Sequence, residues 1–171
     1  MVEASANVSD PSTWTAYGIP DLLTQVEEAH SAGQYLFIWD KSDNIDTFFK
    51  YKGFLIDFYF LASRVEHQRI DADEAIDALR SSFVKAGRQG QHLLINLNDS
   101  VPDFINTYTN PAVFAVETAF NHAEWRKPEV HMAVLKEGEN YSANSQASGL
   151  YYLQPDFTMQ IRTTAATAEA V

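Results

Sequence analysis

The chain has 171 residues, of which 46% are hydrophobic and 13% aromatic, so it is long and apolar enough to form a packed core. Its formal net charge of −11 disfavours nucleic acids and anionic membrane surfaces as partners, because an acidic surface repels phosphates. The absence of cysteine excludes disulfides, zinc–thiolate sites and cysteine nucleophiles, and it favours an intracellular, cytoplasmic protein.

The first residues are polar and do not resemble a signal peptide, because residues 1–20 lack an apolar segment. Residues 1–18 are rich in Ser, Thr and Ala, and they are predicted to form an N-terminal arm. Trp14 and Tyr17 are expected to anchor this arm either on its own domain or on a partner, since exposed aromatic side chains are common interface anchors.

The first regular elements are predicted to be a helix and a buried strand. The helix starts at Pro20, because proline fits a first helical turn and apolar residues then recur at helical spacing. Gly33 is the expected cap of this helix. The run 34–40 is short, apolar and closed by an acid, which is typical of a buried strand.

An aromatic segment follows the polar loop 41–46. Phe54, Phe58, Leu61 and Val65 recur at helical spacing, so a helix is predicted over 54–67. A strand over 54–60 is the alternative, because short apolar runs are compatible with both structures.

The strongest local signal surrounds Asp71. Asp71 and Glu74 form the start pattern of a helix, and the helix should end at Gly87 or Gly90. The apolar run 92–98 comes next and is predicted to be a second buried strand.

The rest of the chain is predicted to contain one helix and three strands. The helix begins at Pro111 and ends near Trp125. The strands are expected at 130–135, 150–153 and 157–163, and 164–171 is expected to be a C-terminal tail. Residues 19–163 thus form a single domain. The alternation of helices and strands predicts a three-layer α/β fold with an open, mainly parallel sheet, a P-loop-like architecture without a phosphate-binding loop.

The loop after the first strand argues against nucleotide hydrolysis. Phosphate-binding loops need glycines and a lysine, whereas the segment 40–44 has no glycine and carries two acids. The sequence also lacks the glycine–serine pattern of hydrolases. No catalytic residue and no cofactor are therefore predicted.

Two groups of metal-ligand side chains occur along the chain. His122, Glu124 and His131 would need to meet in space, since an i, i+2 pair diverges on a helix. The aspartates of the 40–46 loop follow a strand and offer the oxygen ligands that Mg²⁺ prefers. Surface or core side chains explain both groups more simply, so no metal site is predicted.

Two segments resemble the AAA+ modules of dynein heavy chains. Residues 86–98 are similar to the helix, glycine and strand at the Walker B position, and residues 154–164 are similar to a later strand of these modules. The Walker A glycines and lysine have no counterpart, and Asn96 and Asn98 stand where the Walker B acids belong. The resemblance implies a nucleotide-type fold without hydrolysis and a scaffold role in a cytoskeletal or ciliary assembly.

Two functional hypotheses follow. The first is a non-catalytic interaction or assembly protein that binds other proteins through its aromatic residues, with neither nucleic acid nor membrane as a partner. Its candidate interface residues are Trp14, Tyr17, Phe48, Phe49, Tyr51 and Tyr59.

The alternative is a small-molecule or nucleotide-binding enzyme that uses the ends of two strands. Its candidate residues are Asp40, Asp43, Asp46, Asn96, Asn98 and Asp99. The sequence determines neither the partner nor the oligomeric state.

Overall fold

A mainly parallel sheet organises the molecule. The computed structural model describes residues 2–5, 15–42, 44–143 and 150–165 of the chain. Within these ranges six strands form one sheet in the order β2-β1-β3-β6-β5-β4. The four parallel strands are β3 (Leu36–Trp39), β6 (Thr158–Thr163), β5 (His92–Asn98) and β4 (Gly53–Asp57). The prediction of an α/β fold with an open parallel sheet is therefore confirmed.

The first residues of the chain extend this sheet. β1 (Val2–Ser5) pairs antiparallel with β3 and with β2 (Thr15–Tyr17). The segment 1–18 is thus not simply an arm, although residues 6–14, including Trp14, lie outside the described residues. An antiparallel edge needs no continuous apolar run, which is why the composition of this segment did not predict its strands.

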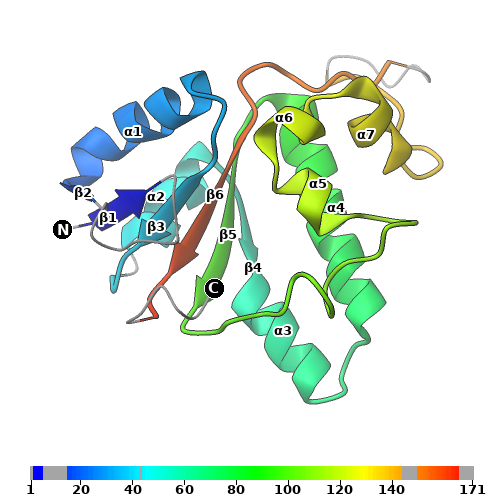
Figure 1. The fold of residues 1–171 in the computed structure, drawn as a ribbon, viewed down its shortest axis with the longest axis horizontal. Helices are drawn as coiled ribbons and strands as arrows, with labels where there is room; N and C mark the ends of the chain where they lie inside the picture. The colour runs from blue at the N-terminus through cyan, green and yellow to red at the C-terminus, as the bar shows by residue number, and fades with distance from the viewer. Residues whose placement is uncertain (1, 6–14, 43, 144–149, 166–171) are drawn as a thin grey trace.

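Helices cover both faces of the sheet and give the fold three layers (Figure 1). On one face lie α1 (Ile19–Ser31) and α2 (Asn44–Lys52). The other face carries the long helix α4 (Ala72–Gln89) and four shorter helices: α3 (Phe58–Glu66), α5 (Val116–Ala119), α6 (His122–Trp125) and α7 (Pro128–Ala133). The described helices are all too short or too polar to cross a lipid bilayer.

The strand β5 contributes side chains to the hydrophobic core on both faces of the sheet. Leu94 packs toward α1 and α2, whereas Leu93, Ile95 and Leu97 pack toward α4, because successive side chains of a strand point to opposite faces. All five residues from Leu93 to Leu97 are buried, as the continuous apolar run predicts for a central parallel strand.

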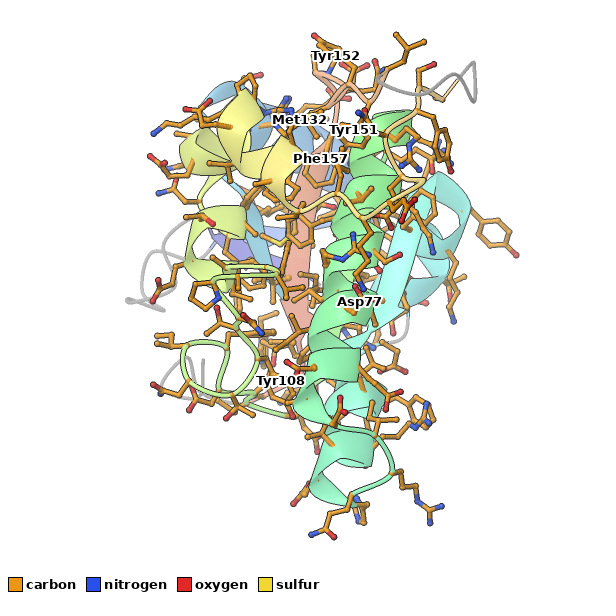
Figure 2. All side chains as sticks on the ribbon, turned by 90° about the vertical axis from the view of Figure 1, so that its right-hand side faces the viewer. Asp77, Tyr108, Met132, Tyr151, Tyr152 and Phe157 are labelled. Atoms are coloured by element: carbon orange, nitrogen blue, oxygen red, sulfur yellow. The ribbon has the colours of Figure 1, made fainter. Side chains whose placement is uncertain are left out.

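Local signals set the ends of α4 as predicted. The Asp71 carboxylate accepts a hydrogen bond from the Glu74 backbone N–H at 2.8 Å, which caps the first turn. Gly90 ends the helix in the left-handed conformation, with φ of 65°, and glycine adopts this conformation without steric cost. Figure 2 looks onto this helix, with Tyr151 and Phe157 near its upper end and Tyr108 near its lower end.

Two predicted helices are divided in the structure. The segment 54–67 begins as strand β4 and becomes helix α3 only at Phe58, after Asp57 accepts a hydrogen bond from the Phe60 N–H at 3.0 Å. The strand alternative therefore holds for its first residues. The segment from Pro111 to Trp125 forms two short helices, and Asn121 caps the second through the N–H groups of Ala123 and Glu124. In both places a side-chain cap starts a new helix.

Two predicted strands are wrong. Residues 130–135 lie mostly in helix α7, which Pro128 opens and in which the Lys127 carbonyl accepts from the Val130 and His131 N–H groups. Residues 150–153 pair with no strand of the described sheet. A short apolar run does not by itself distinguish a strand from a buried helical turn or an extended loop.

An aromatic cluster centred on Phe83 of α4 joins the helical layer to the sheet. Phe83 is fully buried, and its ring centroid lies 5.1–6.0 Å from those of four other rings. These rings belong to Phe114, Phe120, Trp125 and Phe157. Because these four rings come from different segments, Phe83 packs each of those segments against α4.

Replacing Phe83 by alanine should lower the free energy of unfolding by about 3–5 kcal/mol, because it removes a buried ring and leaves a cavity among its four neighbours. Urea denaturation followed by circular dichroism measures this change. Phe60→Ala is the matched control, since Phe60 is 57% exposed, and it should cost less than about 0.5 kcal/mol. Equal losses in the two variants would contradict the central role of Phe83.

Candidate functional site

The carboxyl ends of the parallel strands bring several predicted polar residues together. Asp40 follows β3, Asn96 and Asn98 end β5, and Asp46 lies in the first turn of α2. In open α/β sheets this edge is the usual ligand-binding position. The Asn96 amide donates a hydrogen bond to the Asp46 carboxylate at 2.9 Å, so residues fifty positions apart are in direct contact.

Arg162 of β6 occupies the centre of this edge. Its side chain is only 1% exposed, because β6 lies between β3 and β5 in the sheet. The guanidinium donates to the Asn96 amide oxygen at 3.0 Å and to the carbonyls of Asp40 and Ser42 at 3.0 and 2.7 Å. One of its nitrogens also lies 3.6 Å from the Asp46 carboxylate. A protein cation thus stands where a bound ligand would be expected.

The turn after β3 is closed by its own side chains. The buried Asp40 carboxylate accepts from the backbone N–H of Ser42 at 3.1 Å and from its hydroxyl at 2.9 Å. A phosphate-binding loop would instead present free backbone N–H groups toward a ligand. The Asp40 carboxylate thus satisfies the Ser42 N–H and hydroxyl within the turn itself.

The other predicted ligand residues take different positions. Asn98 has a left-handed φ of 51° at an irregularity in the β5–β6 pairing, and its carbonyl accepts from the Thr163 hydroxyl at 2.9 Å. Asp99 is exposed in the turn that follows. Asp43 lies outside the described residues. The structure therefore gathers three of the six candidates, Asp40, Asp46 and Asn96, around Arg162.

Sequence reasoning missed the role of Arg162. The available signal was a charged residue inside an otherwise buried strand, since arginine is rarely buried without partners. Its partners were not foreseeable, because they depend on β6 being placed between two strands that precede it in the chain.

Arg162→Met should lower the free energy of unfolding by about 3–5 kcal/mol, because it removes the cation from a buried charged network and leaves its acceptors without that donor. Arg69→Met is the control, since Arg69 is exposed, and it should change stability by less than about 0.5 kcal/mol. Urea denaturation of both variants measures the difference. A fully stable Arg162→Met protein would show that the network does not hold the sheet edge.

The predicted interface residues differ widely in exposure. Tyr51 is 87% and Tyr59 39% exposed, whereas Phe49 is fully buried under α1 and is not available to a partner. Its burial corrects the interface prediction, because α2 turns this ring toward β3 and β5. Tyr17 and Phe48 are half-buried against the same cluster.

Tyr59 lines a groove at the carboxyl edge of the sheet, which we call the α3 groove. It has a volume of about 490 Å³ and lies between α3 and the loop 100–108. Val101, which is 51% exposed, and the buried Tyr108 also line it. Sequence reasoning did not identify Val101, because the exposure of a single apolar loop residue has no periodic signal.

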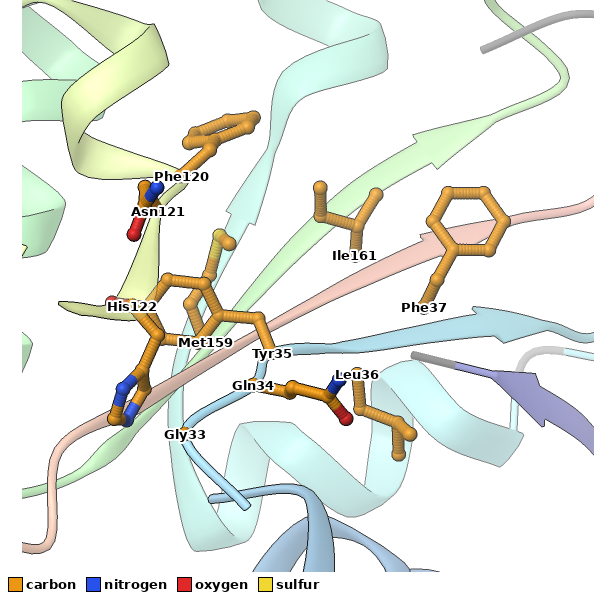
Figure 3. Close-up of a pocket in the computed structure, with 10 residues that line it drawn as sticks. All are labelled: Gly33, Gln34, Tyr35, Leu36, Phe37, Phe120, Asn121, His122, Met159 and Ile161. Carbon is orange, nitrogen blue, oxygen red and sulfur yellow. The ribbon is translucent and has the colours of Figure 1, made fainter. Parts of the chain in front are cut away.

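A second cavity, of about 360 Å³, lies toward the amino ends of β3 and β6 (Figure 3). Phe37 and Ile161 project from neighbouring strands on the same side as Phe120, while the Tyr35 ring extends toward the α5–α6 corner. The buried Tyr35 hydroxyl has no hydrogen-bond partner in the described ranges, and burial raises its pKa. The lining residues include Leu36, Phe37 and Met159 and contain no Asp, Glu, Lys or Arg, so the cavity is mainly apolar.

Two histidines join distant segments beside this cavity. The His122 Nε2 lies 3.2 Å from the His30 Nδ1, and the His30 Nε2 lies 2.9 Å from the Pro155 carbonyl. Since a carbonyl only accepts, His30 donates through Nε2 and its Nδ1 accepts from His122 when both rings are neutral. Burial, followed by Arg126 and His30, lowers the pKa of His122 to about 4, and burial also lowers that of His30.

The free energy of unfolding should decrease as the pH is lowered from about 6.5 to about 4, where this histidine pair would take up protons. The ordinary histidine pKa is 6.5 and that of folded His122 is about 4, so the unfolded chain binds the proton first as the pH decreases. The loss should be on the order of 1–2 kcal/mol between these limits, because solvent screens a side chain that is only partly buried. His122→Gln should reduce this dependence and the exposed control His67→Gln should not, as urea midpoints at pH 7 and pH 4.5 would measure.

The described residues contain no group of three or more His, Asp or Glu side chains that could hold a metal ion. His122 faces His30, whereas His131 is buried and bonded to the Trp125 carbonyl, so the two histidines of the group considered in the sequence do not converge. Comparison of the chain with family models, curated proteins and solved structures finds no match.

Proposed function

We propose that this protein is a non-catalytic interaction domain that contributes to the assembly of other proteins. The observation that carries the proposal is Arg162, whose buried guanidinium fills the position where an open α/β sheet usually binds its ligand. A cation bonded to three protein acceptors contributes to the architecture of the edge, and moving it to admit a substrate would expose those acceptors.

The exposed surface supports the same proposal. Several large apolar side chains are exposed around the carboxyl edge, among them Tyr59, Phe60, Val101 and Ile105. Exposed aromatic and branched side chains that line a groove are typical of surfaces that bind other proteins. The resemblance of 86–98 and 154–164 to dynein AAA+ modules would place such a domain in a cytoskeletal or ciliary assembly.

An alternative function, a small-molecule or nucleotide-binding enzyme at the same edge, is favoured by one observation. The buried Nε–H of Arg162 has no acceptor among the residues that the structure describes. An anionic oxygen beside Asp40 and Asn96 would supply one. This alternative therefore predicts an anionic ligand that contacts Arg162.

Thermal denaturation with Mg²⁺–ATP, Mg²⁺–ADP and Mg²⁺–GTP distinguishes the two functions. The interaction domain should show no stabilisation by any nucleotide, because Arg162 and its partners occupy the site. In parallel, the tagged chain should recover defined protein partners from the cells that express it.

A saturable stabilisation would contradict this proposal. Binding should then add about 2.7 kcal/mol at a nucleotide concentration of 100 times the Kd. If Asn96→Ala abolished the effect while Glu28→Ala on α1 preserved it, the enzyme alternative would replace the interaction domain.

A further inference from the structure

The α3 groove combines an apolar interior with a negatively charged rim. Ala62, Pro102 and Tyr108 form buried or half-buried parts of its lining, and Tyr59 and Val101 expose apolar surface, one from each of its two segments. A desolvated apolar centre within a polar rim is the usual anatomy of a protein-binding surface.

The charges of the rim have one sign. Glu66 and Asp103 both line the groove and are exposed, and neither lysine nor arginine is among its lining residues. Glu66 acts on the interior as well, because together with burial its carboxylate raises the pKa of the Tyr108 hydroxyl. A cationic group near the rim would therefore be attracted to the groove.

The walls of the groove are already held in place. The Tyr108 ring packs edge-to-face against buried Phe58 with ring centroids 5.0 Å apart. Asp103 accepts from the backbone N–H of Asn106 at 2.9 Å and from its side-chain amide at 3.0 Å, which stabilises the loop 100–108. A partner would meet a formed surface and would pay little to order it.

A second copy of this chain does not match the groove. The chain carries 23 acidic and 12 basic residues and has no run of Lys or Arg longer than Arg126-Lys127. Two copies with a net charge of −11 each would repel one another as they approached. The complementary occupant is a basic segment of a different protein.

We infer that the α3 groove binds a lysine- or arginine-bearing amphipathic segment of a partner protein, with an apolar side chain between Tyr59 and Val101 and a cation at Glu66. This inference rests on the proposed interaction function and names the chemistry of its partner. It distinguishes Tyr59 from Tyr51, which is more exposed but lies on α2, on the opposite face of the sheet.

The test uses the full chain and two synthetic helical peptides of about 14 residues, which is enough for several helical turns. One carries leucine and lysine at amphipathic spacing, and the other carries glutamate in place of lysine. The lysine peptide should bind and shift the backbone NMR signals of Tyr59, Ala62, Val101 and Thr107. The glutamate peptide should not bind.

Matched variants separate the groove from general attraction to an acidic protein. Tyr59→Ser should weaken binding of the lysine peptide about tenfold, as removal of a central aromatic anchor usually does, while Tyr51→Ser should leave the affinity unchanged. Glu66→Lys should weaken it more than Glu28→Lys, which makes the same change of charge on α1, and the difference should shrink at high salt. Circular dichroism would confirm that each variant is folded.

Four results would overturn the inference, and three of them come from the peptide experiments. The first is that Tyr59→Ser and Tyr51→Ser, and likewise Glu66→Lys and Glu28→Lys, weaken peptide binding equally. The second is that the backbone NMR signals shift only at other surfaces. The third is that the lysine and glutamate peptides bind equally well. Concentration-dependent dimerisation through the Tyr59 surface would also overturn it, because the occupant would then be a second copy. Each of these leaves the proposed interaction function standing, since nucleotide binding at Arg162 and the recovery of protein partners test that function separately.

Discussion

The burial of one arginine determines the form of the carboxyl edge of the parallel sheet. Arg162 lies on β6 between two strands whose carboxyl ends carry polar groups, and a guanidinium removed from water requires acceptors. It obtains them from the turn at Asp40 and Ser42 and from Asn96, so strands β3, β5 and β6 are tied together at their ends. The same contacts that stabilise this edge place a protein side chain where related architectures hold a ligand.

A partner protein is consequently expected to bind beside the carboxyl edge of the sheet and not at Arg162 itself. Helix α3, which follows β4 directly, and the loop that follows β5 form the α3 groove, in which apolar side chains and the carboxylates of Glu66 and Asp103 remain exposed. At the opposite ends of the strands, His30 and His122 join α1 to α6 while both rings are neutral. The two ends of the sheet thus differ in chemistry: one carries a buried cation and an acidic rim, and the other depends on uncharged histidines.

Elements with strong local signals were predictable, and elements decided by their neighbours were not. The cap at Asp71, the glycine end of α4 and the continuous apolar run of β5 act within a few residues, so the pattern alone identified them. The apolar run 130–135 does not by itself distinguish a strand from a helix, and its first residues are helical because Pro128 opens a helical turn there. The strands at 2–5 and 15–17 form because β3 offers a free edge, which no local pattern records.

The candidate site divides in the same way. The sequence by itself determined the fold class, the polar character of the strand ends and the absence of a glycine-rich phosphate loop, because composition and periodicity depend only on local residue types. Only the tertiary structure decided that Arg162 meets Asn96, that Phe49 is buried and that Tyr59 and Val101 line one groove. These facts depend on strand order and on which helix face packs inward, and both arise from contacts between residues far apart in the chain.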